Sequence, residues 1–366
     1  MNTMSGSIKA GVRSSLERST SLASKAQKVD SVIRNLRIVA IHTLSDVYER
    51  ARSWLEGHQH GVASEIEVQR PRDNTTTLDS DLTWVVHRSL HKYLQQVSNR
   101  LEVAFESKFE IEEQLIQLQI EPGEASEPAV KLEAHGDPLA GSKNLTRQIE
   151  GVVNKRVYSF PFGPNSMSLL AFKLPRLCGQ HYVAGAAVDL GYATMYSGTR
   201  LWSGSYESFI GDLSVVPESF NLGKARSPRV LLLSFMNMDG NQDFYDQVRR
   251  SIEQTVKGAE VHVGGVPCAS WNLTRLVNAT YDAVVDVRTL SPQRIRYLEP
   301  IDCAGLIPFL LGTGCFLANE QGQAVSGFEC GRRPICLLAS YSQDLIDKLV
   351  RVVRPIGLQT GGAWKK

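Results

Sequence analysis

Residues 136–145 read Gly-Asp-Pro-Leu-Ala-Gly-Ser-Lys-Asn-Leu, and this stretch is the most informative part of the chain. Taken alone, Asp137 followed by Pro138 is typical of a turn, because Asp and Pro both favour turn positions. A second interpretation is chemical. Asp137 offers a carboxylate, and a helix that opens at Gly141 would offer backbone N–H groups able to hold a phosphate. The rest of the sequence decides between these interpretations.

The composition is that of an ordinary globular chain. Its 366 residues are 42% hydrophobic and 21% charged, which is enough for a large core or two subdomains. The net charge of +2 by itself argues neither for nor against a nucleic-acid partner. The basic residues are scattered and form no cluster interleaved with aromatics, so we expect no nucleic-acid partner. No apolar run approaches the ~18–20 residues of a membrane span, so we expect no membrane partner.

The cysteines carry no pairing or metal-binding pattern. There are six, none in a Cys-x-x-Cys pair and most in apolar runs: Cys178, Cys268, Cys303, Cys315, Cys330 and Cys336. We expect buried, reduced thiols in an intracellular protein, and no zinc site.

The first 28 residues are rich in serine and carry five basic residues against one acid, Glu17. Two interpretations remain open for them. A disordered basic tail agrees with a cytoplasmic protein, and an organelle transit peptide would have the same composition.

Hydrophobic periodicity predicts helices and strands that alternate along the chain. Residues 29–55 and 82–97 are predicted helices, residues 62–78 a hairpin, and residues 101–119 a charged helix that changes to a strand at 115–120. Clear strands follow at 167–172 and 181–188, and a linker at 214–228. Beyond it, predicted strands at 230–235, 261–263, 283–287 and 334–338 alternate with predicted helices at 244–257, 271–278, 303–311 and 343–353. This pattern indicates a layered α/β architecture. It divides the chain into a tail (1–28), an N-terminal α+β subdomain with the 136–145 loop (29–215) and a C-terminal α/β subdomain (216–366).

Four separated segments resemble, in the same order, motifs of the inositol monophosphatase and fructose-bisphosphatase superfamily. Residues 122–126 resemble its Gly-Glu-Glu metal segment, and residues 136–145 resemble its Asp-Pro-(Ile/Leu)-Asp-Gly-(Thr/Ser) loop. Residues 268–286 resemble its Gly-(Ser/Thr)-Ala-Ala helix and Asp-Ala-x-x-Glu strand, and residues 300–305 its Trp-Asp-x-Ala-(Ala/Gly) motif. The resemblance implies an α/β fold of the sugar-phosphatase type, a layered αβαβα sandwich.

The resemblance also implies a magnesium-dependent hydrolase of phosphate monoesters, often homodimeric. Glu124, Asp137 and the carbonyl of Leu139 would hold the first Mg²⁺, and Asp302 would be the last metal ligand. Glu124 and Ser142 would be catalytic, because they would contact the attacking water. The implied substrate-binding residues are Gly141, Ser142, Ala269, Ser270 and Asp286.

Departures from the family pattern put the second ion in doubt. Ala140 stands where the loop's second aspartate belongs, and Ala125 stands where the second glutamate belongs. The lysine that precedes the family's Thr-x-x-Asp segment is not evident in residues 72–78. One missing ligand should weaken a metal site by at least an order of magnitude, about 10-fold or more. Losing the counter-charge at the leaving group commonly costs ~10²–10³ in rate.

Three functions therefore remain open, and with them the question of whether the chain is an enzyme. The first is a divergent protein that binds a phosphorylated sugar, polyol or nucleotide, or acts as a regulatory subunit, with hydrolysis weakened or lost. The second is an active phosphatase of the inositol-phosphate or sugar-phosphate type, in which Asp79 or another acid replaces the missing ligand. The third is new chemistry on the same scaffold, for which Cys303 is the candidate nucleophile, although it also fits a buried core thiol.

Overall fold

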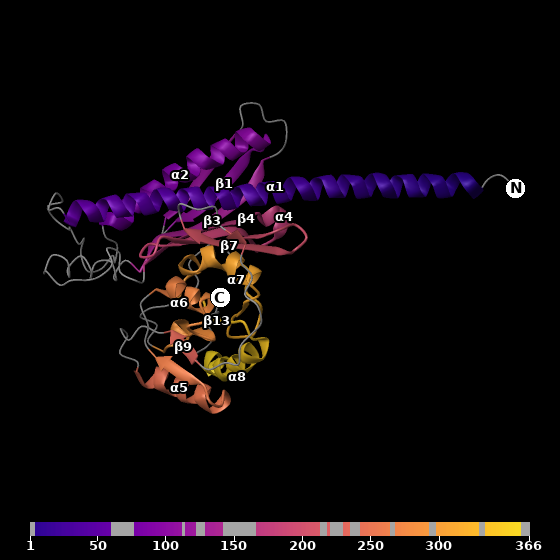
Figure 1. The fold of residues 1–366 in the computed structure, drawn as a ribbon. Helices are drawn as coiled ribbons and strands as arrows, with labels where there is room; N and C mark the ends of the chain where they lie inside the picture. Colours follow the sequence, from indigo (N-terminus) through magenta and orange to yellow (C-terminus); the bar gives the residue numbers. More distant parts are fainter. Residues whose placement is uncertain are drawn as a thin grey trace.

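The computed structural model describes residues 4–59, 77–111, 114–121, 129–141, 166–212, 218–219, 230–234, 242–263, 268–292, 298–328 and 334–359. Two long helices, α1 (Met4–Gln59) and α2 (Thr77–Leu101), form the first layer and cover one face of a large sheet. A short-helix layer, a second sheet, and the pair α5 (Gln242–Thr255) and α8 (Gln343–Gln359) follow (Figure 1). The chain is thus a layered αβαβα sandwich, as the sequence predicts.

The large sheet has eight strands in the order β2-β1-β3-β4-β5-β6-β7-β8. Only β1 and β3 run parallel, and all other neighbours are antiparallel. The strands are β1 (Phe105–Ile111), β2 (Gln114–Ile120), β3 (Val130–Ala140), β4 (Met167–Lys173), β5 (Tyr182–Asp189), β6 (Thr194–Arg200), β7 (Tyr206–Asp212) and β8 (Glu218–Ser219). A four-residue helix, α4 (Pro175–Cys178), joins β4 to β5.

The second sheet has five strands in the order β10-β9-β11-β13-β12. Its centre is parallel, because β9 pairs in parallel with both β10 and β11, while β13 is antiparallel to its two neighbours. The strands are β9 (Val230–Ser234), β10 (Glu260–Val263), β11 (Ala283–Asp286), β12 (Phe316–Ala318) and β13 (Leu337–Ser340).

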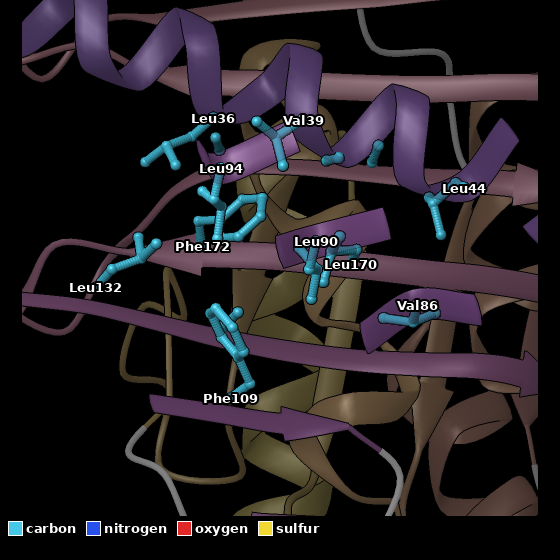
Figure 2. Packing of buried hydrophobic residues seen from close by; sticks show 14 of the residues in the cluster. Leu36, Val39, Leu44, Val86, Leu90, Leu94, Phe109, Leu132, Leu170 and Phe172 are labelled. Atoms are coloured by element: carbon cyan, nitrogen blue, oxygen red, sulfur yellow. The ribbon is translucent and has the colours of Figure 1, made fainter. Parts of the chain in front are cut away.

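The first core lies between the two long helices and the large sheet. Apolar residues of α1 recur at three- and four-residue spacing, which gathers them on one helical face. Leu36 and Leu44 on that face are fully buried and pack toward Leu90 of α2 and Phe172 of β4 (Figure 2). This burial, rather than the weak helix propensity of β-branched residues in α1, fixes the position of both helices.

The middle layer consists of short helices packed tightly between the two sheets. It contains α6 (Ala269–Val277), α7 (Ile307–Gly312) and the 3₁₀ turns η1 (Arg288–Leu290), η2 (Pro300–Asp302) and η3 (Ala304–Leu306). A Cβ atom on Gly305 would collide with the carbonyl oxygen of Ala186, and one on Gly198 would collide with the backbone of Phe309. Glycine at these two positions therefore lets η3 and α7 approach β5 and β6 backbone to backbone.

Some boundaries differ from the sequence predictions. Helix α1 begins at Met4 instead of residue 29. Residues 105–111 form β1 and not a helix, and the apolar residues Phe105, Phe109 and Ile111, which share one face of this strand, are all buried. The last strand occupies residues 337–340 instead of 334–338. The predicted hairpin and linker lie outside the described residues except for 77–78 in α2 and 218–219 in β8. None of the described helices is long and apolar enough to cross a membrane.

Candidate functional site

Strand β3 carries the first site residue, Asp137, at an irregularity in the sheet. The register between β3 and β4 shifts between Asp137, which faces Leu169, and Ala140, which faces Met167. Pro138 has no N–H to donate to the ladder, which accounts for a bulge at this point. The Asp137 carboxylate accepts a hydrogen bond from the N–H of Leu139 at 3.0 Å, and its side chain is mostly buried.

Ala140 ends β3 in apolar surroundings. It is buried and belongs to the core between the sheets, together with Cys268, Ala269 and Cys303. The next residue, Gly141, has a φ of 86°, a left-handed conformation that only glycine adopts without strain. The chain therefore turns sharply after β3, and it leaves a methyl group where the family pattern has a carboxylate.

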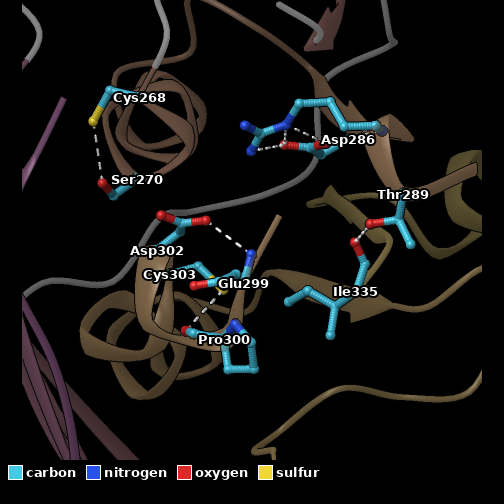
Figure 3. Close-up of polar contacts among 10 residues, drawn as sticks. Cys268, Ser270, Asp286, Thr289, Glu299, Pro300, Asp302, Cys303 and Ile335 are labelled. Carbon is cyan, nitrogen blue, oxygen red and sulfur yellow. Dashed lines mark hydrogen bonds and ion pairs between the residues drawn. The ribbon is translucent and has the colours of Figure 1, made fainter. Parts of the chain in front are cut away.

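The start of α6 faces the end of β3. Cys268 occupies the N-cap position, and its thiol lies 3.7 Å from the carbonyl oxygen of Ala140 and 3.3 Å from the hydroxyl of Ser270 (Figure 3). Burial raises the pKa of the Cys268 thiol to about 12, the bond with Ser270 lowers it in part, and the nearby Asp137 and Asp302 carboxylates raise it further. The thiol is therefore neutral at physiological pH.

Asp302 ends the turn η2, which packs against β3. One of its oxygens accepts a hydrogen bond from the N–H of Glu299 at 2.8 Å, and the Glu299 side chain accepts one from the N–H of Asp302. This reciprocal pair is a capping box, which fixes the orientation of the carboxylate. Burial raises the pKa of Asp302, and the positive charge of Arg288 opposes that rise.

Asp286, at the end of β11, is bonded to an arginine two residues further along. Nε of Arg288 lies 3.0 Å and 3.1 Å from the two carboxylate oxygens of Asp286, and Nη2 lies 2.7 Å from one of them. Both side chains are almost fully buried. Burial alone would lower the pKa of Arg288, but the charge and hydrogen bonds of Asp286 and the charge of Asp302 raise it, so the guanidinium stays charged.

The structure thus brings five of the predicted residues or their backbones to one region: Asp137, Leu139, Ala269, Ser270 and Asp302. Asp286, at the end of β11, is bonded to Arg288. Gly141 follows directly from β3, whereas Glu124 and Ser142 lie outside the described residues. Within the part of the chain that the structure describes, no group of three or more His, Cys, Asp or Glu side chains is placed to hold a metal ion.

Sequence reasoning missed Arg288 and the contact made by Cys268. The available signal for Arg288 was its place directly after the predicted strand at residues 283–287, where a buried arginine needs a charged partner such as Asp286. By contrast, His135 of β3 is a fully buried residue close to Asp137 in the sequence. Its ring lies 2.5 Å from the hydroxyl of Tyr182, and burial lowers the pKa of His135 to about 3. Four of the six cysteines are buried free thiols, and Cys178 is half-buried.

Comparison with solved structures defines the class of fold. A protein from Pyrococcus horikoshii described as similar to inositol-1 monophosphatase is 15% identical, with a TM-score of 0.54 over 87% of this chain and 98% of its own. Staphylococcal inositol monophosphatase II is 11% identical, with a TM-score of 0.55 over 88% and 96%. The same Staphylococcus aureus enzyme bound to inositol monophosphate is 11% identical, with a TM-score of 0.52 over 88% and 96%.

The chain therefore has the fold of the inositol monophosphatase superfamily. No protein-family profile and no curated protein sequence matches it.

Proposed function

We propose that this chain binds a phosphorylated sugar, polyol or nucleotide at the end of β3 and the start of α6, and that magnesium-dependent hydrolysis of phosphate monoesters is weakened or lost. Ala140 is the observation that carries the proposal. It is buried against Cys268 and supplies no side-chain oxygen at the position where the superfamily loop carries a metal-ligand aspartate.

The residues present fit one magnesium ion better than two. Carboxylate and carbonyl oxygens are the donors that Mg²⁺ prefers. Asp137 and the carbonyl of Leu139 have this chemistry, and Glu124 would complete the set from outside the described residues. When bound, the ion would supply positive charge to the phosphate and to an attacking water. A second ion does not fit, because Ala140 leaves only Asp302 and the shared Asp137.

The chain's own contribution to phosphate binding would come from backbone groups. Helix α6 begins at Ala269, so its first N–H groups are unbonded within the helix and carry the partial positive charge of the helix dipole. The side chains of Cys268 and Ser270 are bonded to each other. Recognition at this point therefore falls to the amides, which require no metal. The bound inositol monophosphate of the staphylococcal protein supports a ligand of this kind.

Calorimetric titration with myo-inositol 1-phosphate, fructose 1,6-bisphosphate and adenosine 3′,5′-bisphosphate tests the binding. We expect at least one to bind more tightly with Mg²⁺ than without it. Asp137→Asn should remove this magnesium dependence, and Asp243→Asn, at an exposed position on α5, should leave it intact. No binding by any phosphorylated compound would contradict the proposal.

Phosphate release from the same compounds tests the loss of hydrolysis. We expect turnover roughly 10²–10³-fold below that of an intact two-metal site, because one electrostatic stabiliser is missing. Turnover at a normal rate would favour the alternative, an active phosphatase of the inositol-phosphate or sugar-phosphate type in which another acid replaces the missing ligand.

A further inference from the structure

Strand β2 forms one edge of the large sheet and carries none of the usual protection of an edge strand. Within the part of the chain that the structure describes, it pairs only with β1, and the register runs through all seven of its residues without a bulge. Its sequence, Gln-Leu-Ile-Gln-Leu-Gln-Ile, contains no charged residue and no proline. Charges, prolines and bulges are the features that keep edge strands from pairing with other chains.

The other edge strands of the two described sheets are shorter. β8 has two residues, β12 has three and β10 has four, whereas β2 has seven. A short edge offers few backbone groups to an incoming strand. The outer edge of β2 is therefore the longest row of backbone N–H and C=O groups that the described sheets present for pairing with a further strand.

The two faces of β2 differ, and this limits which strand fits beside it. Ile116, Leu118 and Ile120 face the core between the sheet and the long helices, where Ile120 is buried and the other two are partly buried. Gln117 and Gln119 lie on the opposite face and are exposed. Side chains directly opposite each other in neighbouring strands share one face of the sheet. A fitting strand therefore places apolar side chains on the first face and polar ones on the second.

A second copy of β2 meets this requirement. In an antiparallel pairing about a two-fold axis at Leu118, that residue lies opposite its own copy, and Ile116 lies opposite the partner's Ile120. On the other face, Gln117 lies opposite the partner's Gln119, so that amide meets amide and no like charges are opposed. We propose that this chain forms a homodimer through β2, in which the two large sheets join into one continuous sheet.

The residues around β2 agree with this pairing. Glu121, which follows the strand, would lie opposite the partner's Leu115 and not opposite another acid. Gln95 of α2 donates a hydrogen bond to the carbonyl of Glu121 at 2.8 Å, so this face of α2 lies beside the end of β2. Trp84 lies on the same face of α2, about three turns away, and is 60% exposed. A stable interface buries roughly 1,200–2,000 Å² in total, and this face of α2 would add to what the strands alone bury.

The test replaces the two exposed glutamines by charges of one sign. In Gln117→Lys with Gln119→Lys, each new side chain would meet a like charge across the two-fold axis, so the dimer should dissociate, and Gln117→Glu with Gln119→Glu should dissociate it as well. An equimolar mixture of the two variants should dimerise again, because opposite charges then meet at every such pair. Sedimentation velocity on the full chain, at one protein concentration, measures the fraction of dimer.

Gln247→Lys with Gln254→Lys is the matched control. It adds the same charge at two exposed positions of α5 and should leave the dimer intact. Circular dichroism establishes that each variant is folded, and if only one charged variant folds, its dissociation is the test. Wild type that is monomeric, a dimer that survives the charged variants, or folded charged variants that stay monomeric when mixed would overturn the proposal. The dimer needs neither a phosphate nor a metal ion, so this test is independent of the proposed function.

Discussion

The thiol of Cys268, the N-cap residue of α6, lies 3.7 Å from the backbone carbonyl oxygen of Ala140 at the end of β3. This contact joins the two elements that would hold a phosphate and a metal ion, and it does so with a neutral, buried group. The methyl group of Ala140 fits these surroundings, whereas a carboxylate would need a counter-charge that a thiol does not provide.

Ala140→Asp should therefore destabilise the protein in the absence of divalent cations. A buried polar group without partners costs about 1–3 kcal/mol, and a charged one costs more. Asparagine has nearly the same volume as aspartate and carries no charge, so Ala140→Asn is the matched control. It should lower the free energy of unfolding less than Ala140→Asp does at pH 7. Urea denaturation measures both free energies of unfolding. The free energies of unfolding of the two variants should converge as the pH falls, because protonation removes the charge of the introduced aspartate. Equal losses of stability at pH 7 would contradict this account.

Leu36→Ala should destabilise the chain by about 2–5 kcal/mol, because it leaves a cavity where α1 packs on the large sheet. Leu36 is fully buried, whereas Ile38 on the same helix is 38% exposed. Ile38→Ala should therefore change the free energy of unfolding by no more than about 0.5 kcal/mol. Thermal or urea unfolding measures both. Similar losses of free energy of unfolding from the two substitutions would show that the packing of Leu36 against the large sheet does not stabilise the fold.

Long periodic segments made the fold predictable from the sequence. The helix around residues 29–55 follows from apolar periodicity. Strands β4 and β5 follow from short, largely apolar runs, which agree with their burial at every position. The segment 105–111 was predicted as a charged helix, although Glu106, Lys108 and Glu110 alternate with Phe105, Phe109 and Ile111 at the two-residue period of a strand. The structure pairs this strand with β2 and β3 and buries Phe105, Phe109 and Ile111.

Candidate site residues could be predicted only where they lie in recognisable motifs. Asp137 and Asp302 were predicted in this way, and the structure brings β3 and η2 together. The bonding of Arg288 to Asp286, and of Cys268 to Ala140, depends on how separate elements pack. No spacing rule in the sequence gives those contacts.

The cysteines should react with a thiol reagent at different rates, according to how deeply each is buried. Cys178 is half-buried, whereas Cys268 is enclosed, and burial raises the pKa of its thiol to about 12. Because the thiolate is the reactive form, a buried thiol with a high pKa reacts slowly. With Ellman's reagent on the native protein, Cys178→Ser should remove one rapidly reacting equivalent, and Cys268→Ser should remove none. A lower rapid count for Cys268→Ser would show that the contact with Ala140 opens to solvent.

The ion pair between Arg34 of α1 and Glu207 of β7 should make stability depend on pH. Nη2 of Arg34 lies 2.9 Å from Oε1 of Glu207, and the hydrogen bond from Arg34 lowers the pKa of Glu207. A carboxyl with a lowered folded-state pKa stabilises the protein above its unfolded-state pKa, and that stability is lost as the pH falls through the folded-state pKa.

Because both side chains are partly exposed, the pair should contribute roughly 0.5 kcal/mol at pH 7. Glu207→Gln should therefore be less stable than wild type by that amount at pH 7 and equal to it near about pH 3. Glu49→Gln, at an exposed position on α1, is the control and should show no such change. Urea denaturation across the pH range measures the difference, and a gap that widens toward low pH would mean that Glu207 acts through a contact other than its pair with Arg34.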